Sequence, residues 1–174
     1  GDGSAIRRLK TVQAWDTAVK DGPNCDYSVG MTFAWDDERW ILFDVIRRRM
    51  NFGDLKASAH AAYQTWEPDL VLVEDSANGS ALVDDMRSEE HFEFKTRSVK
   101  GSKQERFAPA AEWLENGKLA LLRGAPYFEE LRRELLSFPD GRFDDQVDTL
   151  SLFVTRAKLR RGIGETRDMK VTTF

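Results

Sequence analysis

The fold is predicted from one stretch of the sequence, Phe143-Asp144-Asp145-Gln146-Val147-Asp148-Thr149-Leu150-Ser151-Leu152-Phe153. Its apolar residues recur at helical spacing and can face a core: Val147, Leu150 and Phe153. Three aspartates crowd one side of the same helix, because residues three or four apart are neighbours on a helix surface: Asp144, Asp145 and Asp148. One or two carboxylates would suit a helix start, where they answer the helix dipole, but three repel one another. The stretch therefore predicts a helix that carries a functional carboxylate cluster.

The composition is that of one soluble domain with a sizeable core. The chain has 174 residues, of which 41% are hydrophobic and 32% charged. No run is long and apolar enough to cross a membrane and no signal peptide is visible, so we expect no membrane partner. The net charge of −4 argues against a general nucleic-acid coating protein. It does not exclude a nuclease, because a metal ion would offset a carboxylate cluster.

The domain is expected to span residues 10–160, with a linker-like tail at 1–9 and a flexible tail at 161–174. The single cysteine, Cys25, excludes an intrachain disulfide framework and a cysteine metal site. His60 and His91 lie far apart in the sequence and form no zinc motif.

The first third of the chain has the pattern of a three-stranded antiparallel meander. Strand periodicity covers Lys10–Ala18, Tyr27–Trp35 and Arg39–Ile46, with turn residues between these runs. Helical spacing follows over Phe52–Trp66 and stops before Pro68.

The rest of the chain alternates strands and helices. The apolar run Asp69–Asp75 predicts a buried strand in a parallel arrangement, followed by a loop at Ser76–Gly79 and a helix through Met86. Further elements are predicted in order: a strand at 92–99, a helix after 103, a strand at 119–122, a helix at 127–136 and the last helix from about 144. Together these predict an α/β fold with a mixed sheet flanked by helices.

Sites in such sheets form where strand connections switch sides, at the carboxyl ends of strands. If the first strand lies beside the fourth, Asp16 becomes a neighbour of Glu74 or Asp75. The last helix would add its three aspartates. Carboxylates this close repel one another unless a cation joins them, and oxygen ligands favour Mg²⁺ or Mn²⁺ over zinc. Two such ions about 3.5–4 Å apart catalyse phosphodiester hydrolysis, so the pattern predicts a metal-dependent nuclease.

Five segments, in order along the chain, resemble the C-terminal nuclease domain of tailed-phage large terminases. They are Trp15-Asp16-Thr17-Ala18, Val73-Glu74-Asp75-Ser76-Ala77-Asn78-Gly79-Ser80-Ala81-Leu82, Lys100-Gly101-Ser102-Lys103-Gln104-Glu105-Arg106, Asn116-Gly117-Lys118-Leu119 and Asp144-Asp145-Gln146-Val147-Asp148-Thr149-Leu150. The resemblance implies an RNase H-like fold and Mg²⁺- or Mn²⁺-dependent endonucleolytic cleavage of concatemeric viral DNA during genome packaging. It also implies an ATPase domain, a portal protein and a small terminase subunit as partners, in the host cytoplasm.

The resemblance assigns the ligands residue by residue. Asp16 is the first metal ligand, and Glu74 matches the second, although Asp75 can be aligned there instead. Asp144, Asp145 and Asp148 are joint candidates for the third position. Their spacing favours Asp148 with Asp144, which would leave Asp145 as a helix cap.

Basic residues suggest where DNA could lie. Lys100, Lys103 and Arg106 could cradle phosphates near a helix start. Arg47-Arg48-Arg49, at the end of the third strand, could touch the DNA backbone, but a charged edge that prevents strand pairing is the favoured interpretation.

The chain has no Gly-x-x-x-x-Gly-Lys-Ser/Thr loop and should not hydrolyse ATP. It would be the nuclease half of a packaging motor. Within the same fold, a Holliday-junction resolvase, an RNase H or a transposase core remain alternatives. A catalytically silent module that docks DNA or portal protein is the alternative outside the enzymes.

Overall fold

The computed structural model describes residues 11–18, 26–87, 93–97 and 100–159, with the backbone alone at 93–97. The expected tails, Cys25 and His91 lie outside these ranges. In chain order the elements are β1 (Thr11–Asp16), β2 (Ser28–Trp35), β3 (Trp40–Arg48), α1 (Phe52–Trp66), β4 (Leu70–Glu74), α2 (Ala77–Met86), β5 (Glu93–Arg97), α3 (Lys103–Glu115), β6 (Leu119–Leu121), α4 (Phe128–Ser137) and α5 (Asp145–Leu159).

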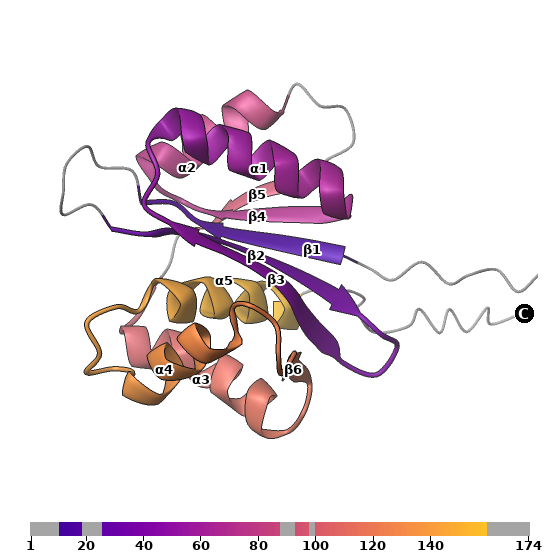
Figure 1. Cartoon of the computed structure of the whole chain (residues 1–174), viewed down its shortest axis with the longest axis vertical. Helices are drawn as coiled ribbons and strands as arrows, with labels where there is room; N and C mark the ends of the chain where they lie inside the picture. The colour runs from indigo at the N-terminus through magenta and orange to yellow at the C-terminus, as the bar shows by residue number, and fades with distance from the viewer. Residues whose placement is uncertain (1–10, 19–25, 88–92, 98–99, 160–174) are drawn as a thin grey trace, which may run out of the picture.

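Six strands form one sheet in the order β5-β4-β1-β2-β3-β6. Strands β1, β2 and β3 pair antiparallel, whereas β4 runs parallel to β1, β5 to β4 and β6 to β3. Helices α1 and α2 cover one face of the sheet, and α3, α4 and α5 cover the other (Figure 1). The predicted mixed sheet is confirmed, including the placement of the first strand beside the fourth.

Strand alternation sorts the side chains onto these two faces. In β1, Ala14 packs in the core beneath α3, α4 and α5, and Trp15 packs in the core beneath α1 and α2. In β4, Leu72 belongs to the same core as Ala14, and Val73 belongs to the same core as Trp15. The last residue of each strand continues the alternation, and both therefore belong to the α5 face of the sheet.

A bulge in β3 changes which of its side chains face α4 and α5. Leu42 pairs with Phe33 and Asp44 pairs with Thr32, which leaves Phe43 as an extra residue. An extra residue reverses the alternation beyond it. Leu42 and Val45 accordingly contact the same core, although they lie three residues apart.

Helix α1 has the predicted bounds, but the predicted loop at 76–79 is helical from Ala77 onward. The Ser76 hydroxyl caps α2 by accepting the N–H of Gly79. A Cβ at Gly79 would lie 2.2 Å from the carbonyl oxygen of Glu74. Glycine thus allows α2 to begin directly against the end of β4, which the loop prediction overlooked.

Helix α5 buries the predicted apolar side chains. Val147, Leu150 and Phe153 are at most 1% exposed, and the ring of Phe153 stacks on Phe33 at 3.7 Å between centroids. This contact holds α5 against the centre of the sheet. No helix within the described ranges is long and apolar enough to cross a membrane.

A candidate metal centre at the end of the sheet

Two parallel neighbouring strands end in acidic residues. Asp16 is the last residue of β1 and Glu74 the last of β4, one position beyond the pair Trp15 and Val73. Glu74 lies close enough to Asp16 to raise the pKa of the Asp16 carboxyl group. Asp75 lies one residue further along and is exposed. The structure therefore brings Glu74, and not Asp75, to Asp16.

Asp16 is the electrostatic centre of the cluster. Burial raises its pKa well above the ordinary value, and the adjacent Glu74 raises it further. The negative charges of Asp148 and Asp145 add to the same shift. Carboxylates from β1, β4 and α5 thus meet at one point.

Asp145 and Asp148 are the α5 residues that reach this point. Burial, together with the charges of Glu134 and Asp144, raises the pKa of Asp145 to about 6. Burial also raises the pKa of Asp148, although Lys103 offsets part of that shift.

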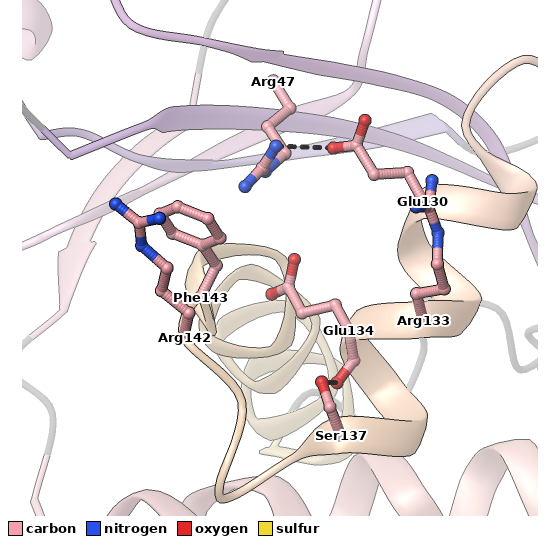
Figure 2. Close-up of a pocket in the computed structure, with 7 residues that line it drawn as sticks. All are labelled: Arg47, Glu130, Arg133, Glu134, Ser137, Arg142 and Phe143. Atoms are coloured by element: carbon pink, nitrogen blue, oxygen red, sulfur yellow. Dashed lines mark hydrogen bonds and ion pairs between the residues drawn. The ribbon is translucent and has the colours of Figure 1, made fainter.

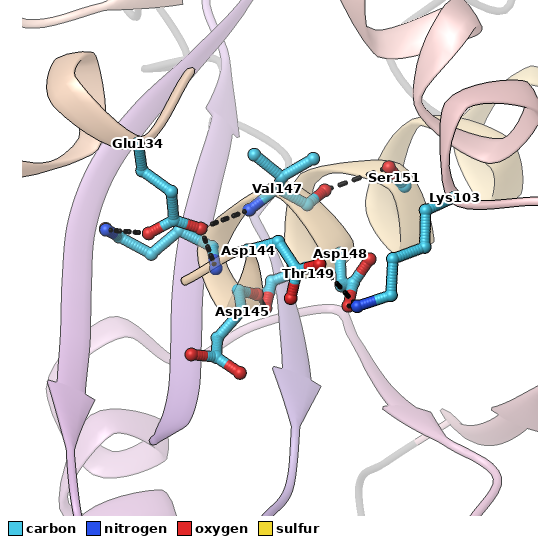
Figure 3. A network of polar contacts seen from close by, with 9 residues as sticks. Lys103, Glu134, Asp144, Asp145, Val147, Asp148, Thr149 and Ser151 are labelled. Carbon is cyan, nitrogen blue, oxygen red and sulfur yellow. Dashed lines mark hydrogen bonds and ion pairs between the residues drawn. The ribbon is translucent and has the colours of Figure 1, made fainter. Parts of the chain in front are cut away.

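Asp144 lies beside Asp148, and its charge raises the pKa of Asp148. It precedes the first residue of α5, and its carbonyl oxygen accepts the N–H of Asp148 at 2.9 Å. Its carboxylate accepts a hydrogen bond from Lys103 (Figure 3). Lys103 contacts both Asp144 and Asp148, so the two aspartates are neighbours as their spacing predicts. Asp145, however, is the residue that joins Asp148 in raising the pKa of Asp16.

The basic residues of α3 lie against the acids. Lys103 forms a salt bridge with Asp148 at 3.5 Å in addition to its contact with Asp144. Partial burial lowers the pKa of Lys103, but the two carboxylates raise it more, so the net shift is upward. The charge of Arg106 lowers the pKa of Asp148, whereas Lys100 is exposed.

The donor set fits a hard divalent cation. Asp16, Glu74, Asp145 and Asp148 offer only carboxylate oxygens, which Mg²⁺ and Mn²⁺ prefer. In the conformation seen, no three acidic, histidine or cysteine side chains in the described ranges already enclose an ion. In this conformation Lys103 offsets part of the negative charge of Asp148, and a cation would take over that role.

Sequence analysis missed Glu134, which holds the start of α5, the helix that carries Asp145 and Asp148. This α4 residue is 6% exposed, and its carboxylate accepts the backbone N–H groups of Gln146 and Val147 at 2.7 and 3.0 Å. It also accepts the side-chain amide of Gln146 at 2.7 Å. The signal available in the sequence was an acid three residues after Leu131, on the buried stripe of α4.

Comparisons with known proteins agree with this architecture. The sequence matches the family model described as the terminase RNaseH-like domain over residues 13–156. No curated protein sequence matches the chain.

Solved structures share the fold at low sequence identity. The large terminase nuclease from thermophilic phage G20c with bound magnesium is 18% identical, with a TM-score of 0.64, over 86% of this chain and 82% of that chain. Structures of the same nuclease also hold zinc or cobalt. A full large terminase from another thermophilic bacteriophage, in complex with ADP, is 12% identical, with a TM-score of 0.68, over 88% of this chain and 41% of that chain. T. thermophilus RuvC in complex with a Holliday junction substrate is 13% identical, with a TM-score of 0.55, over 88% of this chain and 97% of that chain.

Proposed function

Because the chain belongs to the terminase RNase H-like domain family, we propose that it is a metal-dependent DNA endonuclease, the nuclease part of a large terminase. The observation that carries the proposal is the meeting of Asp16 and Glu74 with Asp145 and Asp148. Catalytic sites are where several like charges commonly gather around one buried carboxyl group and raise its pKa.

The same four carboxylates would hold the metal. Two bound Mg²⁺ or Mn²⁺ ions would supply an activated water and stabilise the leaving 3′ oxygen of the cleaved phosphodiester. Asp16 is the central ligand in this proposal, since its pKa is raised by each of the other three. Glu134 orients the helix that carries Asp145 and Asp148. The magnesium, zinc and cobalt of the G20c structures support a divalent cation here.

Lys103 is proposed to alternate between two partners. Without a cation it neutralises Asp144 and Asp148. With the acids neutralised by metal, its ammonium group would be released toward a DNA phosphate, together with Lys100 and Arg106.

In its biological setting, the domain would cut concatemeric viral DNA in the host cytoplasm when a genome is packaged. The ADP-bound large terminase, of which this chain covers 41%, suggests an ATPase domain in the same polypeptide. Portal protein and the small terminase subunit would be further partners.

A second candidate function is Holliday-junction resolution. It is favoured by the likeness to RuvC, which extends over 97% of that chain. Preferential cutting of a four-way junction over linear duplex would support this alternative. Binding of DNA without any cutting would indicate a docking module.

The test is a plasmid cleavage assay with Mg²⁺, Mn²⁺ or EDTA. We expect metal-dependent nicking and linearisation that Asp16→Asn reduces by more than about 100-fold, because even the outer partners of metal ligands are worth about 10–100-fold. The matched control is Asp75→Asn, an exposed acid next to Glu74, which should cut like the unchanged protein. Cutting that persists in Asp16→Asn, or in EDTA, would contradict the proposal.

A further inference from the structure

A polar cavity lies between β3, α4 and the segment that precedes α5. It has a volume of about 330 Å³ and lies at the side of the acidic helix (Figure 2). Three arginines line it, one from each wall: Arg47, Arg133 and Arg142. The lining also includes the ring of Phe143 and the carboxylates of Glu130 and Glu134.

The cavity is basic overall, because three arginines outnumber two glutamates in its lining. Glu130 pairs with Arg47 at 2.6 Å, and Glu134 is occupied by the three N–H donors at the start of α5. Arg133 and Arg142 are both exposed, and neither forms an ion pair with a carboxylate of the described part of the chain. Three guanidinium groups against two carboxylates leave one positive charge in excess at the cavity.

Arg47 is held in position by aromatic rings. Its guanidinium lies 3.6 Å from the ring centroid of Tyr27 and 5.2 Å from that of Phe143. The two rings pack edge to face at 5.3 Å, and Arg142 lies 5.0 Å from the centroid of Phe143. The Nε of Arg47 is buried and has no hydrogen-bond partner among the described residues. A guanidinium held in this way loses little freedom when it binds an anion.

The cavity lies beside the acidic cluster. Val29 pairs with Asp16 on one side and with Arg47 on the other, so the three residues form one row across the sheet. Two strand spacings separate the ends of this row by about 10 Å. The charge of Arg47 also lowers the pKa of Asp145, which shows that the cavity and the cluster interact electrostatically.

We propose that the cavity lined by Arg47, Arg133 and Arg142 binds a backbone phosphodiester of the DNA strand, a few nucleotides from the phosphate that is cut. Guanidinium groups donate paired hydrogen bonds to phosphate oxygens, and phosphates along one strand advance by about 3.4 Å per nucleotide. The inference rests on the proposed nuclease function. It gives Arg47 a role in addition to protecting a sheet edge, because the bulge in β3 turns its side chain into the cavity.

The test measures binding of a short labelled DNA duplex by fluorescence anisotropy, with Ca²⁺ in place of Mg²⁺, over a range of salt concentrations. Arg133→Ala with Arg142→Ala should weaken binding about tenfold at low salt. It should also reduce the slope of log K against log salt by about one for each phosphate that is no longer bound. The matched control is Arg123→Ala with Arg132→Ala. It removes the same charge from exposed arginines that do not line the cavity, and it should change binding little.

Several outcomes would overturn the inference. The first is an equal loss of DNA affinity in the two double variants. The second is the absence of duplex binding by the unchanged protein. The third is stabilisation of the protein by inorganic phosphate that the cavity substitutions abolish, while DNA binding is unchanged. The last result would assign the cavity to a free phosphate. Plasmid cutting is measured on the same preparations. If the cavity substitutions weaken DNA binding but the unchanged protein never cuts, only the proposed function is contradicted. If the protein cuts and the cavity substitutions leave DNA binding unchanged, only this inference is contradicted.

Discussion

The fold opposes the ionisation of Asp145. Its pKa of about 6, against an ordinary 3.8, means that the folded state disfavours a charge that the unfolded chain carries readily. Burial is the main cause, followed by the charges of Glu134 and Asp144. Asp144 differs from it, because Lys103 neutralises its carboxylate. The two neighbouring aspartates can therefore be told apart by experiment.

We predict that Asp145→Asn stabilises the metal-free protein at pH 8 by about 1 kcal/mol, once solvent screening is allowed for. The substitution removes a charge that the fold disfavours, and it should also abolish cutting. Asp144→Asn, the control, breaks an ion pair and should give no stabilisation. Urea unfolding in the presence of EDTA measures the free energy of unfolding of both variants. Equal stabilities for the two variants would remove the distinction drawn between these residues.

The contact between α4 and α5 determines where the acidic helix begins. Glu134 supplies from another helix the acceptor that a capping side chain usually supplies locally. Since Asp145 and Asp148 lie in the first turn of α5, the cap and the candidate ligands form one unit. A change in Glu134 should affect stability and cutting together.

We predict that Glu134→Gln lowers the free energy of unfolding by about 2–3 kcal/mol, because the amide has one acceptor oxygen in place of two. The buried NH₂ group that replaces Oε2 would face the side-chain NH₂ of Gln146, and the charge that strengthens the remaining bonds is lost. Cutting should fall by about 10–100-fold, as for other residues that orient metal ligands. Glu129→Gln, on the exposed side of the same helix, is the control for charge. Urea unfolding and plasmid cutting provide the two measurements. Normal cutting by a destabilised Glu134→Gln variant would show that Glu134 does not position the candidate metal ligands.

The whole molecule should show the charge of the cluster in its dependence on pH. The pKa values of Asp16, Asp145 and Asp148 are raised on folding, so their contribution to stability is fully present below the unfolded pKa, about 4. That contribution is lost as pH rises through the folded values, which include about 6 for Asp145. Over the same range the carboxylates become available to a cation.

We predict that the melting temperature gained on adding Mg²⁺ or Mn²⁺ increases between pH 5 and pH 8. At about 100 times Kd, binding adds about 2.7 kcal/mol. Thermal melts with metal and with EDTA at each pH measure the gain. Asp16→Asn with Asp148→Asn should lose it, and Asp75→Asn should keep it. A gain that is constant with pH, or that falls, would show that these carboxylates do not bind the cation.

Much of the architecture could be predicted from the sequence because it depends on local patterns. Strand alternation through Ala14 and Trp15 predicts two buried faces, and the apolar run before Glu74 predicts a central parallel strand. Adjacent parallel strands bring their carboxyl ends together, so the meeting of Asp16 and Glu74 follows from the strand order. The bounds of α1 follow from its helical spacing and from Pro68, and in the structure Asn51 caps its first turn.

Contacts between segments distant in the sequence determine the remaining features, namely which side chains face the site. Whether Asp144 or Asp145 faces Asp16 depends on the residue at which α5 begins, and Glu134 sets that start from the preceding helix. The bulge at Phe43 determines that Arg47 faces α4. Sequence periodicity determines which side of an element is buried, because burial repeats with the local geometry of the backbone. It carries no record of how far one element is shifted against another, and that offset, set by packing and capping in the folded chain, selects the side chains that form the site.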